Sequence, residues 1–220
     1  MKRNFLAVLL ALVALPFMAQ AQKVKTKTLI DERDGQNYKI IKVGKQWWMA
    51  ENLRYNPGTS LAAENTAIQD EVGFDVNAGY PLSGEEDTDT YGLYYTWKEA
   101  KQVCPTGWKL PSMDDWNELI ETVGGKEVAG AKLTSHSDKW REPFAENIKP
   151  IGFNVEPSGY RFYILYRLWQ EGNRTFFWSS TEAHKQSALG VDFSAGYNEA
   201  FVEDLGYRKE NAISVRCIKE

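Results

Sequence analysis

Cysteine has the widest range of chemistry of any residue type in this chain, and it occurs only twice, at Cys104 and Cys217. Two cysteines in an exported protein predict a disulfide bond, because the compartments outside the cytoplasm are oxidising. Closing so long a loop is worth about 4–5 kcal/mol in the chain-entropy model. Two buried free thiols or one catalytic cysteine are the alternatives, since sequence spacing does not establish geometry. The proline after Cys104 and the apolar residues around Cys217 favour the bond.

An acidic run offers hard oxygen ligands of the kind that calcium prefers. Its members are Glu85, Glu86, Asp87 and Asp89. Calcium requires about six to eight such oxygens, and the Asp-x-Asp spacing with a central glycine is missing here. We therefore expect a solvated acidic loop and no resident cofactor, with calcium binding through these four residues as the alternative.

Exposed aromatic side chains bind sugars and partner proteins, and the segment 160–169 is rich in them. Its composition is typical of a β-strand. If Phe162, Ile164 and Leu168 face inward, the two-residue period of a strand turns the neighbouring aromatic side chains outward. The candidate ligand-binding residues are therefore Tyr163, Tyr166 and Trp169.

The sequence contains no convincing catalytic or zinc-binding set. Ser180, His184 and Asp192 can be drawn as a triad, but nothing else in the sequence supports it, because triads are defined by geometry. His136 and His184 lack the ligand spacing of a zinc site. We expect no catalytic residue and no metal ligand beyond the acidic run, and therefore a protein that is not an enzyme.

The N-terminal segment has the pattern of a secretory signal peptide. Met1-Lys2-Arg3 is followed by an apolar run from Phe5 to Phe17 and by the small-x-small pattern Ala19-Gln20-Ala21. The run is shorter than the roughly 20 apolar residues that cross a bilayer. We predict a signal peptide at 1–21, a short extended leader at 22–30 and a single domain at 31–220, which does not span the membrane after processing. The expected location is secreted, periplasmic or at the cell surface.

Charge makes a nucleic-acid partner an unlikely fit for this chain. It has 26 basic and 30 acidic residues. Without Lys2 and Arg3 the mature chain carries 24 basic residues and a formal charge of about −6. Nucleic-acid binding requires a basic stripe, which this composition does not indicate. We therefore expect an extracellular glycan or protein as the partner.

Two capped helices are predicted in the first half of the chain. Ser112 is an N-cap with Asp115 three residues later, and Trp116, Leu119 and Ile120 begin an apolar stripe that ends before Gly124-Gly125. Thr96 and Glu99 form a second capping box. Residues 56–90 have no periodicity and predict a long irregular loop, which in a compact domain is often functional.

Strand patterns dominate the second half. We predict strands at 160–169 and 176–182, then alternation around Val191, and a terminal strand within 211–219 that carries Cys217. The segment 128–150 reads as mixed polar sequence anchored by Leu133, Trp140 and Phe144. Strands and helices do not alternate, so the fold class is α+β with two short helices flanking a mostly antiparallel sheet and a long irregular loop region.

A succession of motifs resembles the Fibrobacter succinogenes major paralogous domain family, over nearly the whole chain after residue 31. The motifs are Asp34-Gly35-Gln36-Asn37-Tyr38, Gln46-Trp47-Trp48-Met49-Ala50-Glu51-Asn52-Leu53, Tyr91-Gly92-Leu93-Tyr94-Tyr95-Thr96-Trp97, Cys104-Pro105-Thr106-Gly107-Trp108-Lys109-Leu110-Pro111-Ser112, Gly152-Phe153, Trp178-Ser179-Ser180-Thr181-Glu182 and Ser214-Val215-Arg216-Cys217. Each motif is weak alone, and their order is specific. Lys109 departs from the histidine of many relatives, which argues against a metal or catalytic role there.

The resemblance implies a C-type lectin-like fold, in which the N- and C-terminal strands meet and a long loop region presents the binding surface. We expect a non-catalytic recognition or adhesion module that binds a glycan or a protein. One alternative is an enzyme of the formylglycine-generating branch of the same superfold. Another is a structural subunit of a surface assembly. Fold alone does not decide among them.

Overall fold

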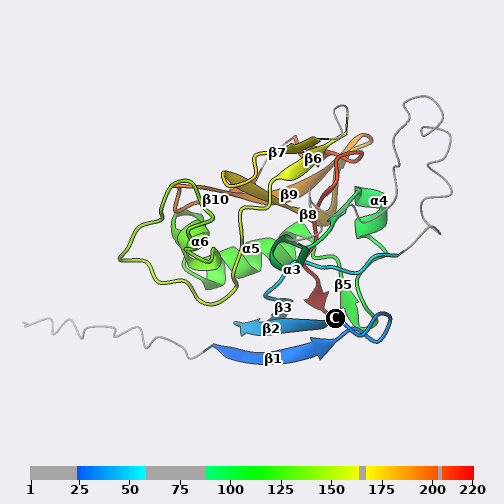
Figure 1. Ribbon diagram of the computed structural model, residues 1–220, viewed down its shortest axis with the longest axis horizontal. Coiled ribbons are helices and arrows are strands. Elements are labelled where there is room, and N and C mark those ends of the chain that lie inside the picture. The colour runs from blue at the N-terminus through cyan, green and yellow to red at the C-terminus, as the bar shows by residue number, and fades with distance from the viewer. Residues whose placement is uncertain (1–23, 58–87, 164–166, 203–204) are drawn as a thin grey trace, which may run out of the picture.

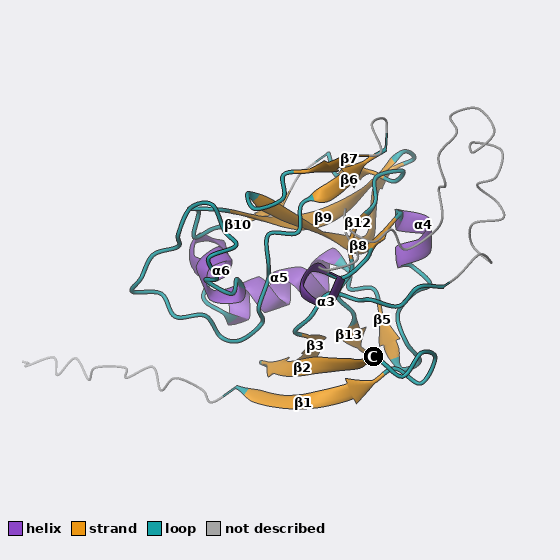
Figure 2. Ribbon diagram, in the orientation of Figure 1, coloured by secondary structure: helices purple, strands orange, loops and turns teal. Residues whose placement is uncertain are grey.

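The computed structural model describes residues 24–57, 88–163, 167–202 and 205–220. Its two larger β-sheets have a helix between them (Figures 1 and 2), and a small two-stranded sheet is described below. The first sheet contains, in order, β1 (Lys25–Ile30), β2 (Asn37–Val43), β3 (Gln46–Met49), β13 (Ile218–Lys219) and β5 (Trp108–Lys109). The second contains β10 (Ala200–Val202), β9 (Ser187–Ser194), β8 (Arg174–His184), β12 (Ile213–Ser214) and β4 (Tyr94–Tyr95), and β11 (Tyr207–Arg208) also pairs with β9. The α+β class is confirmed in this coarser sense, as sheets with a few short helices.

Helix α5 (Met113–Thr122) begins where the capping pattern predicted. Ser112 Oγ accepts a hydrogen bond from the Asp115 amide at 3.1 Å, and Asp115 Oδ2 accepts one from the Ser112 amide at 2.8 Å. Burial alone raises the pKa of Asp115, but these hydrogen bonds and the ammonium of Lys109 outweigh it and hold the pKa below its usual value. Helix α4 (Trp97–Ala100) has the second predicted box, between Thr96 and Glu99. Both helix starts are therefore confirmed.

The main core lies between α5 and the two sheets. Trp116 of α5 is fully buried, 4.7 Å from the ring of Trp48 on β3 and 5.6 Å from the ring of Phe177 on β8, measured between centroids. Its indole N–H donates to the carbonyl of Trp178. The apolar stripe of α5 therefore joins the two sheets, and Figure 1 shows the helix lying between them.

The predicted strand at 160–169 is instead a two-stranded sheet of β6 (Tyr160–Phe162) and β7 (Arg167–Trp169), in which Tyr160 pairs with Trp169. The two-residue alternation therefore does not run unbroken through the segment. Trp169 is exposed, as the assignment expected, and the inward orientation of Ile164 and Leu168 stays a prediction. The predicted terminal strand is also divided, because β12 lies in one sheet and β13 in the other.

Two helices occur where irregular sequence was expected. Helix α6 (Lys126–Leu133) follows Gly125, which has no side-chain cap and a φ of 92°. Helix α3 (Thr88–Tyr91) follows directly on residue 87. The three predicted anchors, Leu133, Trp140 and Phe144, are all buried. In the described ranges, no helix is long and apolar enough to cross a membrane.

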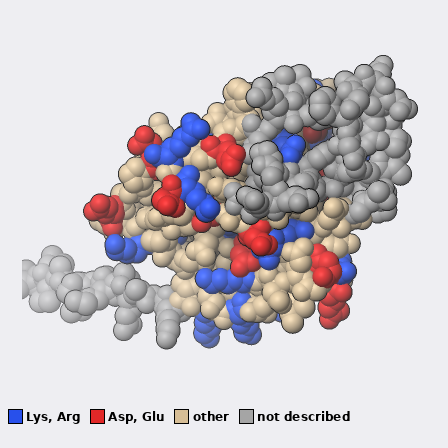
Figure 3. Space-filling view, in the orientation of Figure 1, with Lys and Arg blue, Asp and Glu red and all other residues tan. Residues whose placement is uncertain are grey.

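Strand β1 comes from the segment that was expected to be an extended leader. It pairs with β2 at six consecutive positions, from Lys25 opposite Lys42 to Ile30 opposite Asn37. Basic side chains project along the lower margin of the molecule in Figure 3, in the area that β1 and β2 occupy in Figure 1. This segment is therefore part of the first sheet.

Candidate functional site

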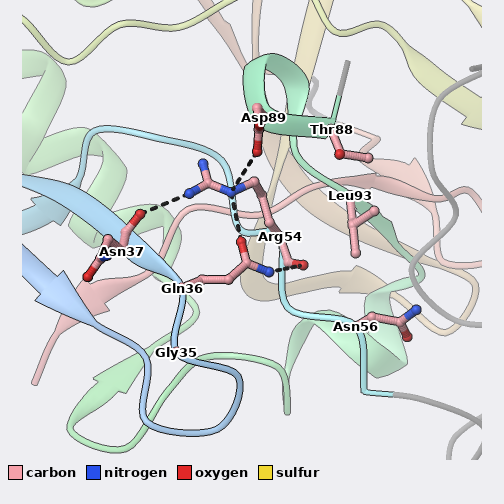
Figure 4. A pocket seen from close by; sticks show the side chains of 8 residues that line it. All are labelled: Gly35, Gln36, Asn37, Arg54, Asn56, Thr88, Asp89 and Leu93. Atoms are coloured by element: carbon pink, nitrogen blue, oxygen red, sulfur yellow. Dashed lines mark hydrogen bonds and ion pairs between the residues drawn. The ribbon is translucent and has the colours of Figure 1, made fainter. Parts of the chain in front are cut away.

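A surface pocket of about 650 Å³ lies where the turn before β2, the segment after β3 and helix α3 meet (Figure 4). It is lined mainly by polar side chains, with one apolar residue. The lining residues are Gly35, Gln36, Asn37, Arg54, Asn56, Thr88, Asp89 and Leu93. Two of the family-like motifs contribute to it, the one at 34–38 and the one at 91–97, which contains Leu93.

A tight turn holds the first wall of the pocket. The Gly35 amide donates to the Asp31 carbonyl at 2.7 Å, and the Asp31 amide donates to the Gln36 carbonyl at 2.8 Å. Gly35 has a φ of 78°, which glycine adopts without steric cost. Burial raises the pKa of Asp31, but hydrogen bonds from Arg33 and its charge outweigh this and leave the pKa lowered. The turn therefore presents Gln36 and Asn37 in a fixed position.

Arg54 joins the walls. Its Nε donates to Gln36 Oε1 at 2.8 Å, Nη2 donates to the Asn37 carbonyl at 2.9 Å, and Nη1 contacts Glu51 Oε2 at 3.2 Å. The guanidinium lies 4.8 Å from the centre of the Tyr38 ring. Only 14% of the Arg54 side chain is exposed, so these contacts fix its orientation. Figure 4 shows this fork at the centre of the pocket.

Several polar groups remain free to meet a ligand. The carboxamide of Asn37 makes no hydrogen bond with any described residue, and Asn37, the first residue of β2, is exposed to solvent. The Asp89 carboxylate is 98% exposed and lies 3.9 Å from Arg54 Nε. Amide and carboxylate groups beside a fixed guanidinium supply both donors and acceptors, which is the chemistry that sugar hydroxyls require. The pocket is suited to binding, and its described residues contain no nucleophile beside a base.

The structure brings only Asp89 of the acidic run into this pocket. Glu85, Glu86 and Asp87 lie outside the described residues. Within the described part of the chain, no group of three or more His, Cys, Asp or Glu side chains has the arrangement of a metal site. Calcium binding by the acidic run therefore stays a prediction.

The aromatic candidates lie elsewhere. Trp169 on β7 is 51% exposed, and the ring of Tyr163, just after β6, lies 4.9 Å from the guanidinium of Arg208. Tyr166 lies outside the described residues. Strands β6 and β7 are at the opposite end of the molecule from β2 in Figure 1, so these residues do not contribute to the pocket. Trp169 remains an exposed aromatic group.

The predicted disulfide is confirmed. The sulfurs of Cys104 and Cys217 are bonded at 2.09 Å, with their Cα atoms 5.8 Å apart, and no free cysteine remains. The Ser180–His184–Asp192 set does not assemble. Asp192 lies opposite Phe176, whereas His184 lies opposite Ser187 at the far end of the same strand pair. The Asp192 carboxylate accepts hydrogen bonds from Arg174 Nη2 at 2.7 Å and from the hydroxyl of Tyr207 at 2.8 Å.

The sequence did not identify Arg54, Gln36 or Asn37 as site residues. The Asp34-Gly35 turn was the only available signal, since it marks where the chain reverses before β2. Nothing in the sequence indicated that Arg54, 18 positions after Gln36, returns to the same turn. Hydrogen bonds between such distant positions depend on how β2 and β3 pair, which sequence patterns do not encode.

These features define an α+β domain of two sheets, closed by one disulfide and carrying a polar surface pocket. A match to a family model gives a more specific classification than the fold. Residues 41–219 match the model of the Fibrobacter succinogenes major domain, and the chain therefore belongs to this family. No curated protein and no solved structure matches the chain significantly.

Proposed function

We propose that this protein is an exported, non-catalytic recognition module that binds a glycan through the pocket around Arg54. One observation carries the proposal: Arg54 is held by Gln36, Asn37 and Glu51, and the Asn37 carboxamide and the ion-paired but exposed Asp89 carboxylate lie accessible beside it. Polar groups fixed before binding reduce the entropic cost of holding a ligand. A sugar presents several hydroxyls that can donate to the carboxylate and accept from the amide.

Export is supported by the signal-like N-terminus and by the disulfide. Met1-Lys2-Arg3 and the following apolar run have the order of a signal peptide. Disulfides persist in oxidising compartments and are rare in the cytosol. We therefore place the protein in the periplasm, at the cell surface or outside the cell.

The scaffold is proposed to be C-type lectin-like. In favour of this, the late strand β13 pairs with the early strand β3, so that distant parts of the chain meet in one sheet. The pocket is lined by residues on both sides of the long segment between Asn56 and Thr88. A C-type lectin-like scaffold would present its binding surface in its long loop region, and the pocket lies at the two ends of this long segment.

The test is a glycan array probed with the protein expressed from the full 220-residue sequence, followed by titration of the best ligand. Asn37→Ala removes the accessible carboxamide and keeps the backbone carbonyl that binds Arg54, and Asp89→Asn removes the exposed carboxylate charge. We expect each to weaken binding about 10-fold, the loss of roughly one hydrogen bond to a charged or fixed group. Asn117→Ala, on the exposed side of α5, is the matched control and leaves affinity unchanged.

A chelator arm separates calcium-dependent from calcium-independent binding. Affinity lost on chelation and restored by calcium would assign the ion to the acidic run. Binding of a glycan that neither pocket variant weakens would refute this pocket as the site. Capture of a protein ligand with no glycan bound would replace the proposed ligand class.

A further inference from the structure

Strand β1 forms an open edge of the first sheet. All six of its residues pair with β2, and among the described strands none lies on its other side. Its side chains are exposed except Leu29, which is half-buried. An edge strand presents backbone N–H and C=O groups of alternate residues that another strand can bind.

The two lysines of this strand, Lys25 and Lys27, lack acidic partners among the described residues. Lys25 lies directly opposite Lys42, an arrangement of like charges that destabilises a strand pair. No described carboxylate forms an ion pair with Lys25, Lys27 or Lys42. An anionic group beside β1 would therefore relieve repulsion that the sheet now contains.

Lysine on an edge strand often prevents pairing, but the geometry here weakens that protection. The ammonium of Lys27 lies 5.1 Å from the ring centre of Trp47 on β3, so its side chain extends back across β2 and away from the open edge. Ile30, at the end of the strand, is 61% exposed. Thr26 and Thr28 are β-branched residues that suit pairing. The edge thus combines an apolar end, a pairing-competent centre and a basic end.

We propose that β1 is the docking edge for an extended acidic segment of a partner protein, which adds to the sheet as an antiparallel strand. The pairings within this sheet are antiparallel, and main-chain hydrogen bonds would supply affinity. Specificity comes from the residues opposite each position. Read from its N-terminus, the partner has apolar residues facing Ile30 and Leu29, and acidic residues facing Lys27 and Lys25. Binding then moves the Lys27 ammonium from the Trp47 ring to the partner's carboxylate. This surface is separate from the Arg54 pocket.

The experiment measures binding of a fluorescent peptide, Val-Val-Thr-Glu-Thr-Glu, by anisotropy, using the protein expressed from the full sequence. We expect saturable binding that weakens as salt is raised. The Lys25→Glu/Lys27→Glu variant should bind about 10-fold more weakly, through the loss of two exposed charge pairs. Lys126→Glu/Lys185→Glu, at exposed positions on α6 and in the turn between β8 and β9, changes the net charge equally and should bind much more strongly than the β1 variant.

N-methylation of the peptide distinguishes strand addition from general charge attraction. Alternate amides of an added strand face the sheet. Methylating one alternate set should abolish binding, whereas methylating the other set should preserve it. Equal effects of the two sets, or equally tight binding of polyglutamate or of phosphatidylglycerol vesicles, would show an anionic-surface contact and overturn the proposal. Absence of peptide binding to the folded wild-type protein would also overturn the proposal.

Discussion

The side chain of Arg216 donates through Nε to Asn52 Oδ1 at 2.8 Å, joining residues that are 164 positions apart. Arg216 is 1% exposed, and its terminal nitrogens donate to the carbonyls of Phe153 and Asn154. Asn52 in turn donates to the Tyr91 carbonyl at 2.8 Å. Burial lowers the pKa of Arg216 to about 9, although the charges of Glu156 and Glu51 oppose this. One buried guanidinium therefore holds three loops together.

Arg216→Met should lower the free energy of unfolding by about 3 kcal/mol or more, because it leaves buried acceptors without their donor. Urea unfolding measures the change. Arg208→Met is the control, since Arg208 is half exposed and its ion pair with Glu210 is 3.7 Å long; its effect should stay within about 0.5 kcal/mol. Similar losses in the two variants would contradict the role given to the buried guanidinium.

Stability should fall as pH rises above 10, partly because of Tyr38. Burial raises the pKa of Tyr38 from 10.0 to about 12. The folded pKa lies above the unfolded one, so the unfolded state loses its proton first and the contribution of Tyr38, complete below pH 10, is lost as pH rises to about 12. Arg216 acts oppositely, because its folded pKa is the lower one.

Comparing wild type with Tyr38→Phe isolates the tyrosine from the arginine. The variant loses the hydrogen bond from the Arg54 amide and should be about 1 kcal/mol less stable at neutral pH. Its stability should then decline less steeply between pH 10 and 12. If the free energy of unfolding falls equally in the two proteins between pH 10 and 12, Tyr38 does not contribute to this pH dependence.

Replacing both Cys104 and Cys217 by alanine should lower the free energy of unfolding by about 4–5 kcal/mol in the chain-entropy model. The bond closes a loop with a sequence separation of 113 residues, so it removes much freedom from the unfolded chain. Denaturant unfolding with and without reductant measures this, and reductant should affect only the wild type. Thiol titration of the native protein should be silent; a reactive thiol there would revive the cysteine-enzyme alternative.

Ser112→Ala should destabilise the protein by about 1 kcal/mol, because it removes the side-chain cap of α5. Thermal or urea unfolding gives the value. Ser180→Ala is a matched control at an exposed position, where the backbone amide that binds the Pro111 carbonyl is kept. An unchanged midpoint for Ser112→Ala would mean that packing of Trp116, and not the cap, fixes the helix start.

The features that the sequence predicted well are local ones. A capping box involves residues three positions apart, so Ser112 with Asp115 and Thr96 with Glu99 could be read directly. Helix α6 had no such signal. It starts after an uncapped glycine, and a Cβ on its Gly130 would lie 2.3 Å from the Glu199 carbonyl. That helix is therefore selected by close packing against a distant segment.

The division between β6 and β7 also left no mark in the sequence. Residues Tyr163-Ile164-Leu165-Tyr166 contain none of the glycine, proline, asparagine or aspartate that usually signals a turn. The terminal strand is interrupted for a different reason. Arg216 must reach the carbonyls at 153 and 154, and the chain crosses from one sheet to the other there. Neither requirement is visible as hydrophobic periodicity.

Strands β12 and β13 each complete a different sheet, yet they follow every other element along the chain. While the polypeptide is being synthesised, β4 and β5 therefore cannot join their sheets until residues 213–219 are available, because they pair with β12 and β13. Contacts between such distant positions close slowly, because the entropy of a large loop is lost before the pairing is gained. Nascent molecules should consequently remain protease-sensitive around β4 and β5 until these residues emerge, and then gain protection at both places together.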